Sequence, residues 1–301
     1  MKGVEEEKVG EMRERGFCVI DEFMGRERAR RMRDEISMLK EMGKLTPNKV
    51  QFSLNGRIEH FTKPNIYEAD MHDPSIREHV TELTELFFSD EMVQLLQETF
   101  PELHLKLGTR ARTLKLQMNA GQGGCFPLHY DNPGRPNMRK VTCLLYLNEG
   151  WKEGDGGELE LVPFLGKPVV IEPIMDRMVL FRSDLLLHRV LPNKEARYCL
   201  TIWIDAEEGH VNRDEDVMLK ISRKEESIES VVEQLRRSPS QRALSRAIYD
   251  QEYKQSILDC MQTSEEVKPM IAAHELHVAA THANATLSSL VRLLASLRED
   301  V

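Results

Sequence analysis

The pattern of apolar and polar residues divides this chain of 301 residues into three regions. In the first region, apolar residues recur at helical spacing over 26–41 and again over 75–99, as in amphipathic helices. Asp73 and Pro74 precede the second stretch, a capping residue followed by a first-turn proline. The intervening residues 45–70 are mixed in polarity. We therefore expect two helical stretches separated by a less regular segment.

The second region, residues 113–205, consists of short runs rich in β-branched and aromatic residues. Turn-forming residues separate the runs at 121–124, 132–134, 148–150, 154–157 and 192–193. Many short strands at this spacing predict a mainly β core of the jelly-roll type. The glycines at 121–124 do not complete a GxGxxG nucleotide motif, because Phe126 stands at the last glycine position, so we interpret them as a turn.

The third region is helical and charged. It predicts a helical C-terminal extension over 207–301, beside a first domain over 1–206 whose strand-rich core covers about 113–205. Near the end of the chain, apolar residues alternate steps of four and three, as in a short heptad seam. The seam comprises Leu276, Ala280, Ala283, Leu287, Leu290, Leu294 and Leu297. Packing on the first domain is the favoured interpretation, and self-association or a partner helix is the alternative.

Composition and charge exclude some classes of function. The chain is 41% hydrophobic and 30% charged, with a net charge of −9, which is ordinary for a globular chain and lacks the basic stripe of a nucleic-acid-binding surface. No apolar run approaches the length of a membrane span, and the first residues lack the apolar core of a signal peptide. We therefore expect neither nucleic acid nor a membrane as a partner.

The cysteines suggest a compartment. They are odd in number, far apart and without a CxxC pair: Cys18, Cys125, Cys143, Cys199 and Cys260. This pattern predicts a reducing intracellular setting, the cytoplasm or alternatively the nucleus. Cys125 lies four residues before His129, and burial as a small hydrophobic residue is its favoured role.

A metal site is the strongest chemical signal. His129 and Asp131 are two positions apart in a strand-like segment, so their side chains should face the same way. His188 follows 59 residues after His129. Two histidines and one carboxylate on one side of a metal leave open positions, as in non-haem Fe(II) oxygenases. A single HxD occurs by chance, and His188 alone could be a core or surface residue, so the interpretation depends on the joint pattern.

Arg197 provides a candidate receptor for a co-substrate. It lies nine residues after His188 at the start of a strand-like run, and its planar guanidinium suits two-point binding of a carboxylate. The hydroxyl groups of Tyr146 and Thr201 offer further hydrogen bonds. An exposed, solvated charge is the competing interpretation for Arg197 alone.

Several motifs in one order resemble a known family. They are HYDN (129–132), VTCLLYLN (141–148), GGELEL (156–161), DRMVLF (176–181), His188 and RYCLTIW (197–203). Together they resemble the 2-oxoglutarate- and Fe(II)-dependent oxygenases, and among them the prolyl hydroxylases related to the hypoxia-factor enzymes. Residues 16–25, 34–44 and 113–119 extend the resemblance upstream, so that it covers about residues 10–206.

The resemblance implies a double-stranded β-helix, or jelly roll, flanked by helices. It implies Fe(II) bound by His129, Asp131 and His188, with 2-oxoglutarate and dioxygen as co-substrates and ascorbate as the reductant. By the same resemblance Arg197 and Tyr146 bind 2-oxoglutarate. Thr201 and Trp203 would be walls of that pocket, with core packing an equal alternative for both.

The implied reaction is hydroxylation of a prolyl residue in an intracellular protein. By the same resemblance Arg139 would face the substrate, and a surface charge is an equal alternative. Arg139 and Arg182 together would favour acidic residues near the target. The alternatives are hydroxylation of another amino acid or a small molecule, an inactive scaffold that recruits partners through its extension, and a metal-binding jelly roll that does not use 2-oxoglutarate.

Two segments depart from the family pattern. Residues 45–70 reproduce neither the charged loop nor the tryptophan of the hypoxia-factor enzymes, so the same substrate is not implied. Asn119 stands where those enzymes carry a tyrosine in the co-substrate pocket, which predicts a different pocket polarity.

Overall fold

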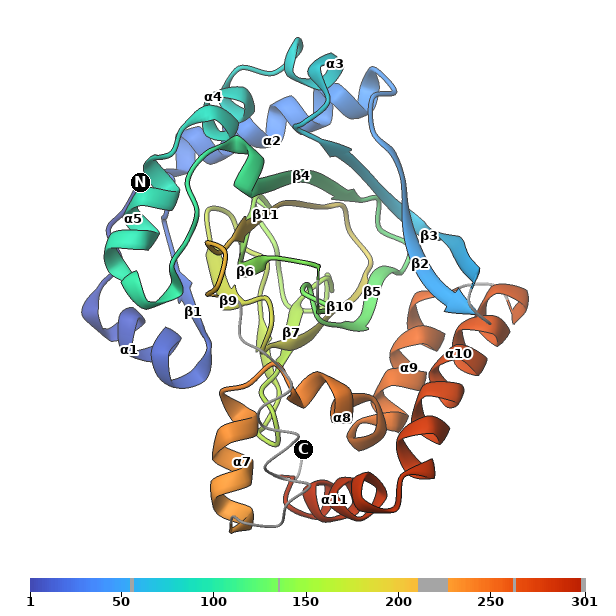
Figure 1. Ribbon diagram of the computed structural model, residues 1–301. Coiled ribbons are helices and arrows are strands. Elements are labelled where there is room, and N and C mark those ends of the chain that lie inside the picture. The colour runs from blue at the N-terminus through green and yellow to red at the C-terminus, as the bar shows by residue number, and fades with distance from the viewer. Residues whose placement is uncertain (55–56, 135, 211–226, 262–263, 299–301) are drawn as a thin grey trace.

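The computed structural model describes every residue except 55–56, 135, 211–226, 262–263 and 299–301. Two antiparallel sheets form its centre (Figure 1). The larger sheet has the order β1-β9-β6-β11-β4-β3-β2, and the smaller one has the order β5-β10-β7-β8. The alternation expected over 113–205 therefore produces strands in both sheets, in agreement with the predicted jelly-roll core.

The strands of the larger sheet are β1 (Phe17–Ile20), β2 (Thr46–Leu54), β3 (Arg57–Asp70), β4 (Arg112–Asn119), β6 (Arg139–Tyr146), β9 (Met178–Arg182) and β11 (Arg197–Asp205). Those of the smaller sheet are β5 (Gly124–His129), β7 (Leu159–Val162), β8 (Val169–Ile171) and β10 (Leu187–Asn193). Apolar side chains from both sheets form one buried cluster that includes Leu144, Phe181 and Leu161. The two sheets thus pack face to face, which is the arrangement of a sandwich core.

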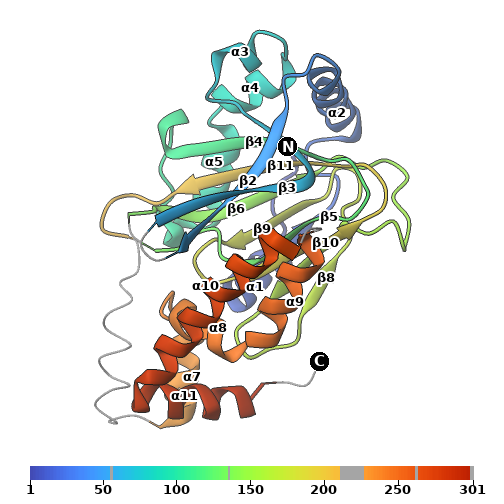
Figure 2. The same cartoon turned by 90° about the vertical axis from the view of Figure 1, so that its right-hand side faces the viewer.

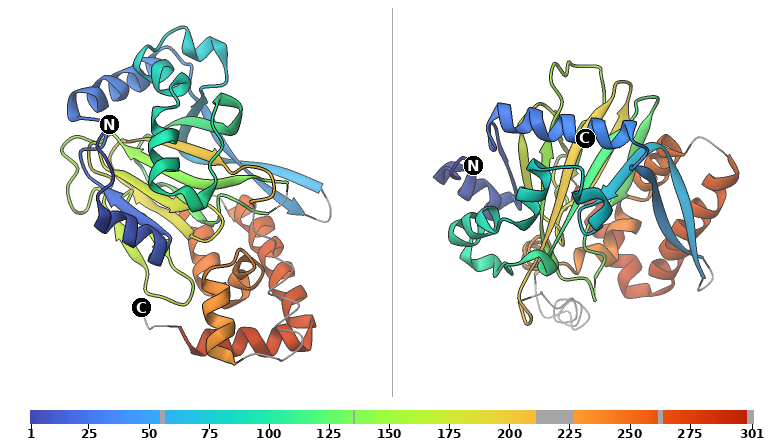
Figure 3. Two further views of the ribbon diagram at one scale, coloured as in Figure 1. Left: turned by 60° about the vertical axis from the view of Figure 1, so that its left-hand side comes forward. Right: turned by 90° about the horizontal axis from the view of Figure 1, so that it is seen from above.

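Helices from the first hundred residues cover the outer face of the larger sheet. They are α1 (Glu6–Arg15), α2 (Arg26–Glu41), α3 (Pro74–Arg77), α4 (Glu82–Phe88) and α5 (Glu91–Thr99), followed by the 3₁₀ turns η1 (Pro101–Leu103) and η2 (Thr109–Ala111). Figure 3 shows α2 crossing over the strands. Its buried face contains Ala29, Met32 and Ile36, spaced as an amphipathic helix requires. The helix expected over 26–41 is therefore confirmed.

The stretch 75–99 is helical but interrupted. The Asp73 carboxylate accepts a hydrogen bond from the Ser75 N–H at 2.8 Å, and Pro74 is the first helical residue, as the sequence predicts. The chain then forms three short helices instead of one. Residues 45–70 form the β2–β3 hairpin, whose β3 strand pairs with β4 and extends the larger sheet.

The C-terminal extension packs against the smaller sheet, on the side away from the N-terminal helices (Figure 2). Its described helices are α7 (Ile228–Arg236), α8 (Gln241–Ile248), α9 (Asp250–Cys260), α10 (Ser264–Ala283) and α11 (Ala285–Ser296). Leu290 and Leu294 share a buried cluster with Leu128 of β5 and Val162 of β7. This supports the favoured interpretation, in which the extension packs on the first domain.

The predicted heptad seam is wrong as a continuous element. Asn284 separates α10 from α11 and caps α11, since its side chain accepts from the N–H groups of Thr286 and Leu287. Leu276 is 59% exposed, whereas Leu294 is fully buried. A local capping interaction thus turns the chain, and the seam residues no longer share one face.

The expectation for the cysteines also needs correction. Cys125 of β5 forms a disulfide with Cys260, the last residue of α9, with a Cα–Cα distance of 5.2 Å. Cys18, Cys143 and Cys199 are buried and free. Cys125 is thus buried, as expected, but it is paired and not free, because tertiary contact joins two residues that lie 135 positions apart. The intracellular compartment stays a prediction. Among the described residues, no helix combines the length and the apolar character that a membrane span requires.

Candidate active site

The three predicted metal ligands converge between the two sheets. His129 ends β5 and faces His188 of β10 directly, because the two are Cα partners in the antiparallel register. Asp131 lies two residues beyond the end of β5, and not within the strand as expected. Its carboxylate lies 3.5 Å from Nε2 of His129 and 3.6 Å from Nε2 of His188. The three ligand atoms lie within 4.8 Å of one another, close enough to share one ion.

Backbone carbonyls orient both imidazoles. Nδ1 of His129 lies 2.8 Å from the Pro127 carbonyl oxygen, and Nδ1 of His188 lies 3.1 Å from that of Leu186. A carbonyl only accepts, so each Nδ1 carries the proton and each Nε2 presents its lone pair towards Asp131. This tautomer is the one that a metal-binding histidine needs, and the strand backbone itself sets it.

Asp131 is held as a carboxylate. Burial alone would raise its pKa, but His188 and His129 and a hydrogen bond from Thr142 hold the pKa well below the usual value. Oγ1 of Thr142 donates to Asp131 at 2.7 Å and lies 2.8 Å from Oγ of Ser183. Burial lowers the pKa of His188 to about 4. The site therefore offers one anionic and two neutral donors, which is the donor set of a facial triad.

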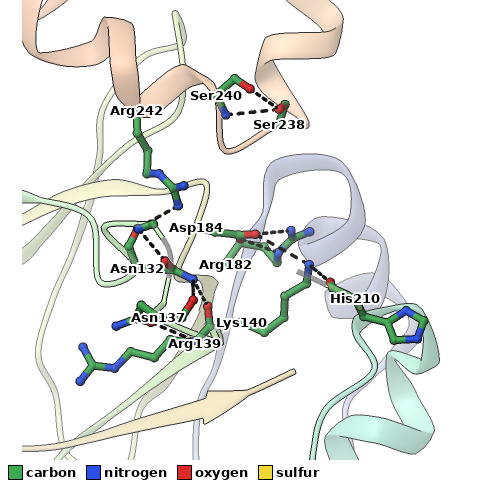
Figure 4. Close-up of polar contacts among 11 residues, drawn as sticks. Asn132, Asn137, Arg139, Lys140, Arg182, Asp184, His210, Ser238, Ser240 and Arg242 are labelled. Atoms are coloured by element: carbon green, nitrogen blue, oxygen red, sulfur yellow. Dashed lines mark hydrogen bonds and ion pairs between the residues drawn. The ribbon is translucent and has the colours of Figure 1, made fainter. Parts of the chain in front are cut away.

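The loop after Asp131 is fixed from two sides (Figure 4). Nδ2 of Asn132 donates to the Arg139 carbonyl at 2.7 Å, and Nη1 of Arg139 donates to the Asp131 carbonyl at 3.2 Å. From α8 of the extension, Arg242 donates to the Asn132 carbonyl at 2.9 Å. The extension thus helps to position the loop that carries a metal ligand.

Arg197 and Tyr146 lie together beside the triad. Arg197 is the first residue of β11 and is 4% exposed, and its guanidinium carbon is 5.0 Å from the Tyr146 ring centroid. Nε donates to the Gly157 carbonyl at 2.8 Å, so the terminal nitrogens remain available to a ligand. The Tyr146 hydroxyl is buried without a hydrogen-bond partner, and burial raises its pKa. This orphaned donor beside a guanidinium fits a bound carboxylate.

Thr201, Trp203 and Arg139 line the same cavity, which has a volume of about 560 Å³. Oγ1 of Thr201 donates to Gln117 at 3.0 Å. The Arg139 guanidinium covers the Trp203 ring at 3.9 Å. Thr201 and Trp203 are therefore walls of the cavity. Arg139 is a partly buried residue of the same cavity, and not the surface charge that the sequence allowed as an alternative.

Arg182 is not part of this site. It lines a different cavity, between α1 and the end of α7, and binds Asp184 through two hydrogen bonds of 3.0 Å (Figure 4). Arg182 therefore lies outside the cavity of the triad, and its expected role in favouring acidic residues near the target stays a prediction. Phe181, the preceding residue of β9, lies against His188 with ring centroids 4.7 Å apart. The next residue, Arg182, therefore lies on the opposite face of the strand.

Sequence reasoning missed several residues of the cavity, notably Lys63, Gln117, Phe126 and Thr142. Lys63 lies in the segment 45–70, which shows no regular pattern, so the sequence held no signal for it. The contact of Thr142 with the site could have been predicted. In a strand, residue 142 lies on the same face as residues 144 and 146, and Tyr146 was already a site candidate.

A second cluster of potential ligands lies elsewhere. His104, Glu207 and His210 bring their ligand atoms within 4.8 Å, but the two imidazole rings are stacked, with centroids 3.6 Å apart and an interplanar angle of 21°. The nitrogen lone pairs lie in the ring planes, which are nearly parallel in this pair, whereas the two histidine rings of the triad are tilted by 48°.

Known proteins show the same combination of fold and site. The sequence profile of the 2OG-Fe(II) oxygenase superfamily matches residues 114–205, the stretch that contains the triad and Arg197. A solved structure from a study of prolyl 4-hydroxylases from Phytophthora capsici aligns over 98% of this chain and 92% of its own chain, with 43% identity and a TM-score of 0.82. The chain is a prolyl-hydroxylase-like member of the 2OG-Fe(II) oxygenase superfamily.

Other relatives of this oxygenase are more distant. Egl nine homolog 1 of Rattus norvegicus is 30% identical over 203 residues, which are 65% of this chain and 57% of the rat protein. A Trichoplax adhaerens prolyl hydroxylase, solved with a hypoxia inducible factor peptide fragment, is 27% identical with a TM-score of 0.53, over 67% of this chain and 88% of that chain. This oxygenase spans 28–57% of the length of its curated relatives.

The residues present fit the cofactors of the family. Two neutral imidazoles and one carboxylate suit Fe(II), and the unpartnered Tyr146 hydroxyl next to Arg197 suits the distal carboxylate of 2-oxoglutarate. Asn119, the departure noted in the sequence, is also fully buried with an unpartnered side-chain oxygen. It is the Cα partner of Arg197 in the β4–β11 ladder.

Proposed function

We propose that this oxygenase hydroxylates a prolyl residue in a protein or peptide, with Fe(II) bound by His129, Asp131 and His188. The observation that carries the proposal is the convergence of these three side chains in one cavity that Arg197 also lines. The Tyr146 ring centroid lies 5.0 Å from the Arg197 guanidinium carbon. The bound Fe(II) and 2-oxoglutarate supply the oxidising chemistry, in which dioxygen yields a hydroxylated product, succinate and carbon dioxide. Ascorbate would serve as the reductant that keeps the iron ferrous.

The chain itself contributes binding, orientation and exclusion of water. Arg197 would hold the distal carboxylate of 2-oxoglutarate through its terminal nitrogens while Tyr146 donates its hydroxyl proton. Thr201 and Trp203 limit the space around the co-substrate. Because Tyr146 and Arg197 are buried, their charge-assisted hydrogen bonds would form away from competing water.

A protein or peptide substrate is supported by the relatives, whose names and descriptions refer to prolyl hydroxylation. Within the cavity, Arg139 offers a cation to a substrate residue with an acidic side chain. Self-association is a weaker proposal, because the α11 half of the expected seam packs on the smaller sheet. It would have to use exposed residues such as Leu276 of α10 and Leu297.

The test measures succinate formed from 2-oxoglutarate with iron, ascorbate and a library of proline-containing peptides, and locates the added oxygen by mass spectrometry. His129→Ala, Asp131→Ala and His188→Ala should each abolish turnover, whereas His277→Ala, at an exposed position of α10, should not. Oxygen found only on other residues or on a small metabolite would reject the prolyl substrate and keep the oxygenase. Near-normal turnover by a triad variant would remove that residue from the site.

A further inference from the structure

Lys63 of β3 carries a buried ammonium group in the wall of the active-site cavity. The residue is only 9% exposed. Its Nζ lies 3.8 Å from the centroid of the Phe126 ring. Among the described residues, Lys63 forms no ion pair with a carboxylate. A cation in this position is costly, because an aromatic face replaces only part of the hydration that burial removes.

The two carboxylates that line the cavity are already engaged by other groups. Lys115 pairs with Glu68 at 3.3 Å and with Asp70 at 3.4 Å. Asp131 faces the two histidines. The two lining carboxylates, Glu68 and Asp131, are thus committed elsewhere, and Lys63 remains without a partner of opposite charge.

Burial lowers the pKa of Lys63 to about 7, and the more distant charges of Glu68 and Asp131 offset this only in part. A carboxylate brought by a ligand would restore the charged state and gain a charge-assisted hydrogen bond in a confined space. The cavity therefore favours a ligand that carries an acidic group at this point.

Lys63 also lies close to the predicted metal ligands. The Phe126 ring that it covers is stacked against the His129 ring, with centroids 6.4 Å apart. One aromatic ring thus separates Lys63 from a metal ligand. An extended peptide advances about 3.3 Å per residue, so a residue a few positions from the target would reach Lys63.

We propose that Lys63 is a specificity-determining residue that binds the carboxylate of an acidic substrate residue close to the hydroxylated position. The co-substrate is not its ligand, because Arg197 and Tyr146 already form a separate carboxylate receptor. The proposal rests on the proposed function, to which it adds the substrate class: an acidic sequence around the target residue.

The experiment uses the full chain and synthetic nine-residue peptides with a central proline, in which Asp or its neutral isostere Asn occupies each flanking position in turn. For wild type we expect one position at which kcat/KM favours Asp by about tenfold or more, the usual value of one charge-assisted hydrogen bond. Lys63→Gln should remove this preference without changing KM for 2-oxoglutarate. Lys63→Glu should reverse the preference, so that a peptide with Lys at this position has a higher kcat/KM than the peptide with Asp.

Lys49→Gln is the matched control, because Lys49 lines the same cavity but is exposed, and it should keep the preference. Circular dichroism spectra would verify that each variant is folded. Lys63→Gln with an unchanged Asp preference, or with an altered KM for 2-oxoglutarate only, would overturn the proposal.

A second measurement separates this proposal from the proposed function. Calorimetric binding of the same peptides to protein loaded with Mn(II) and 2-oxoglutarate requires no turnover. An Asp preference that depends on Lys63, with oxygen added to a residue other than proline, would reject the prolyl substrate and support Lys63. Equal binding of Asp and Asn peptides at every position to wild type would reject the role of Lys63.

Discussion

Arg197 is the residue on which co-substrate affinity should depend most. Its guanidinium is buried beside Tyr146, so Arg197→Gln should weaken 2-oxoglutarate binding by about 1.5–3 kcal/mol. Calorimetry with Mn(II)-loaded protein measures this directly. Arg189→Gln is the control, because Arg189 pairs with Glu160 on the neighbouring strand β7 and lies outside the cavity. Unchanged affinity in Arg197→Gln would contradict the assignment.

Lys63 should also affect stability in a pH-dependent way. Its pKa is about 7 in the folded protein, against 10.5 for an ordinary lysine. Below pH 7 the folded state must bury the charge, and this cost disappears as the pH rises from 7 to 10.5, because the unfolded chain then binds more protons. Lys63→Met should therefore raise the free energy of unfolding at pH 6 by more than at pH 9.

Urea denaturation at the two pH values measures this difference, with Lys49→Met as the exposed control. An equal effect of Lys63→Met at pH 6 and pH 9 would show that the folded protein does not depress this pKa.

At the scale of elements, α11 packs on the smaller sheet and does not continue a heptad seam from α10. Leu290 is 8% exposed and contacts the cluster of β5 and β7, whereas Leu276 of α10 is 59% exposed. Leu290→Ala should lower the free energy of unfolding by about 2–3 kcal/mol, and Leu276→Ala should change it by less than about 0.5 kcal/mol. Chemical denaturation measures both variants. Comparable losses would mean that α10 also buries Leu276, for instance in an oligomer.

The element α9 also bears on the metal site. Oγ of Ser256 accepts a hydrogen bond from the Leu128 N–H at 3.0 Å, one residue before His129, and Cys260 is joined to Cys125 of the same strand. The strand that ends in a metal ligand is therefore fastened to the extension at two points.

At the scale of the whole molecule, the extension and the first domain share a buried apolar cluster and a disulfide. Removal of residues 207–301 would expose Leu128 and Val162 of the smaller sheet, and would leave the Tyr130 hydroxyl without its 2.8 Å contact to Ser245. We expect residues 1–206 alone to lose the cooperative unfolding of the full chain. Calorimetry and limited proteolysis would detect this loss, and a stable, iron-binding fragment would show that the sheet does not need its helical cover.

The sequence by itself determined the chemistry of the site. His129, Asp131, His188 and Arg197 carry functional groups that few other residues can replace. The predicted turns at 132–134, 148–150 and 154–157 lie between strands, whereas the one at 192–193 falls within β10. These are local properties, so the order of strands over 113–205 and the helix over 26–41 followed from them.

Only the tertiary structure decided the rest. Whether Cys125 meets Cys260, whether Arg182 faces the iron site, and whether Lys49 or Lys63 is the buried lysine of the cavity all depend on packing between segments far apart in the chain. The heptad seam failed for a local and a tertiary reason together. The cap at Asn284 begins a separate helix α11, and packing on the smaller sheet then buries Leu290 and Leu294. Local periodicity shows that a helix has an apolar face, but the surface that covers this face is set by the fold as a whole.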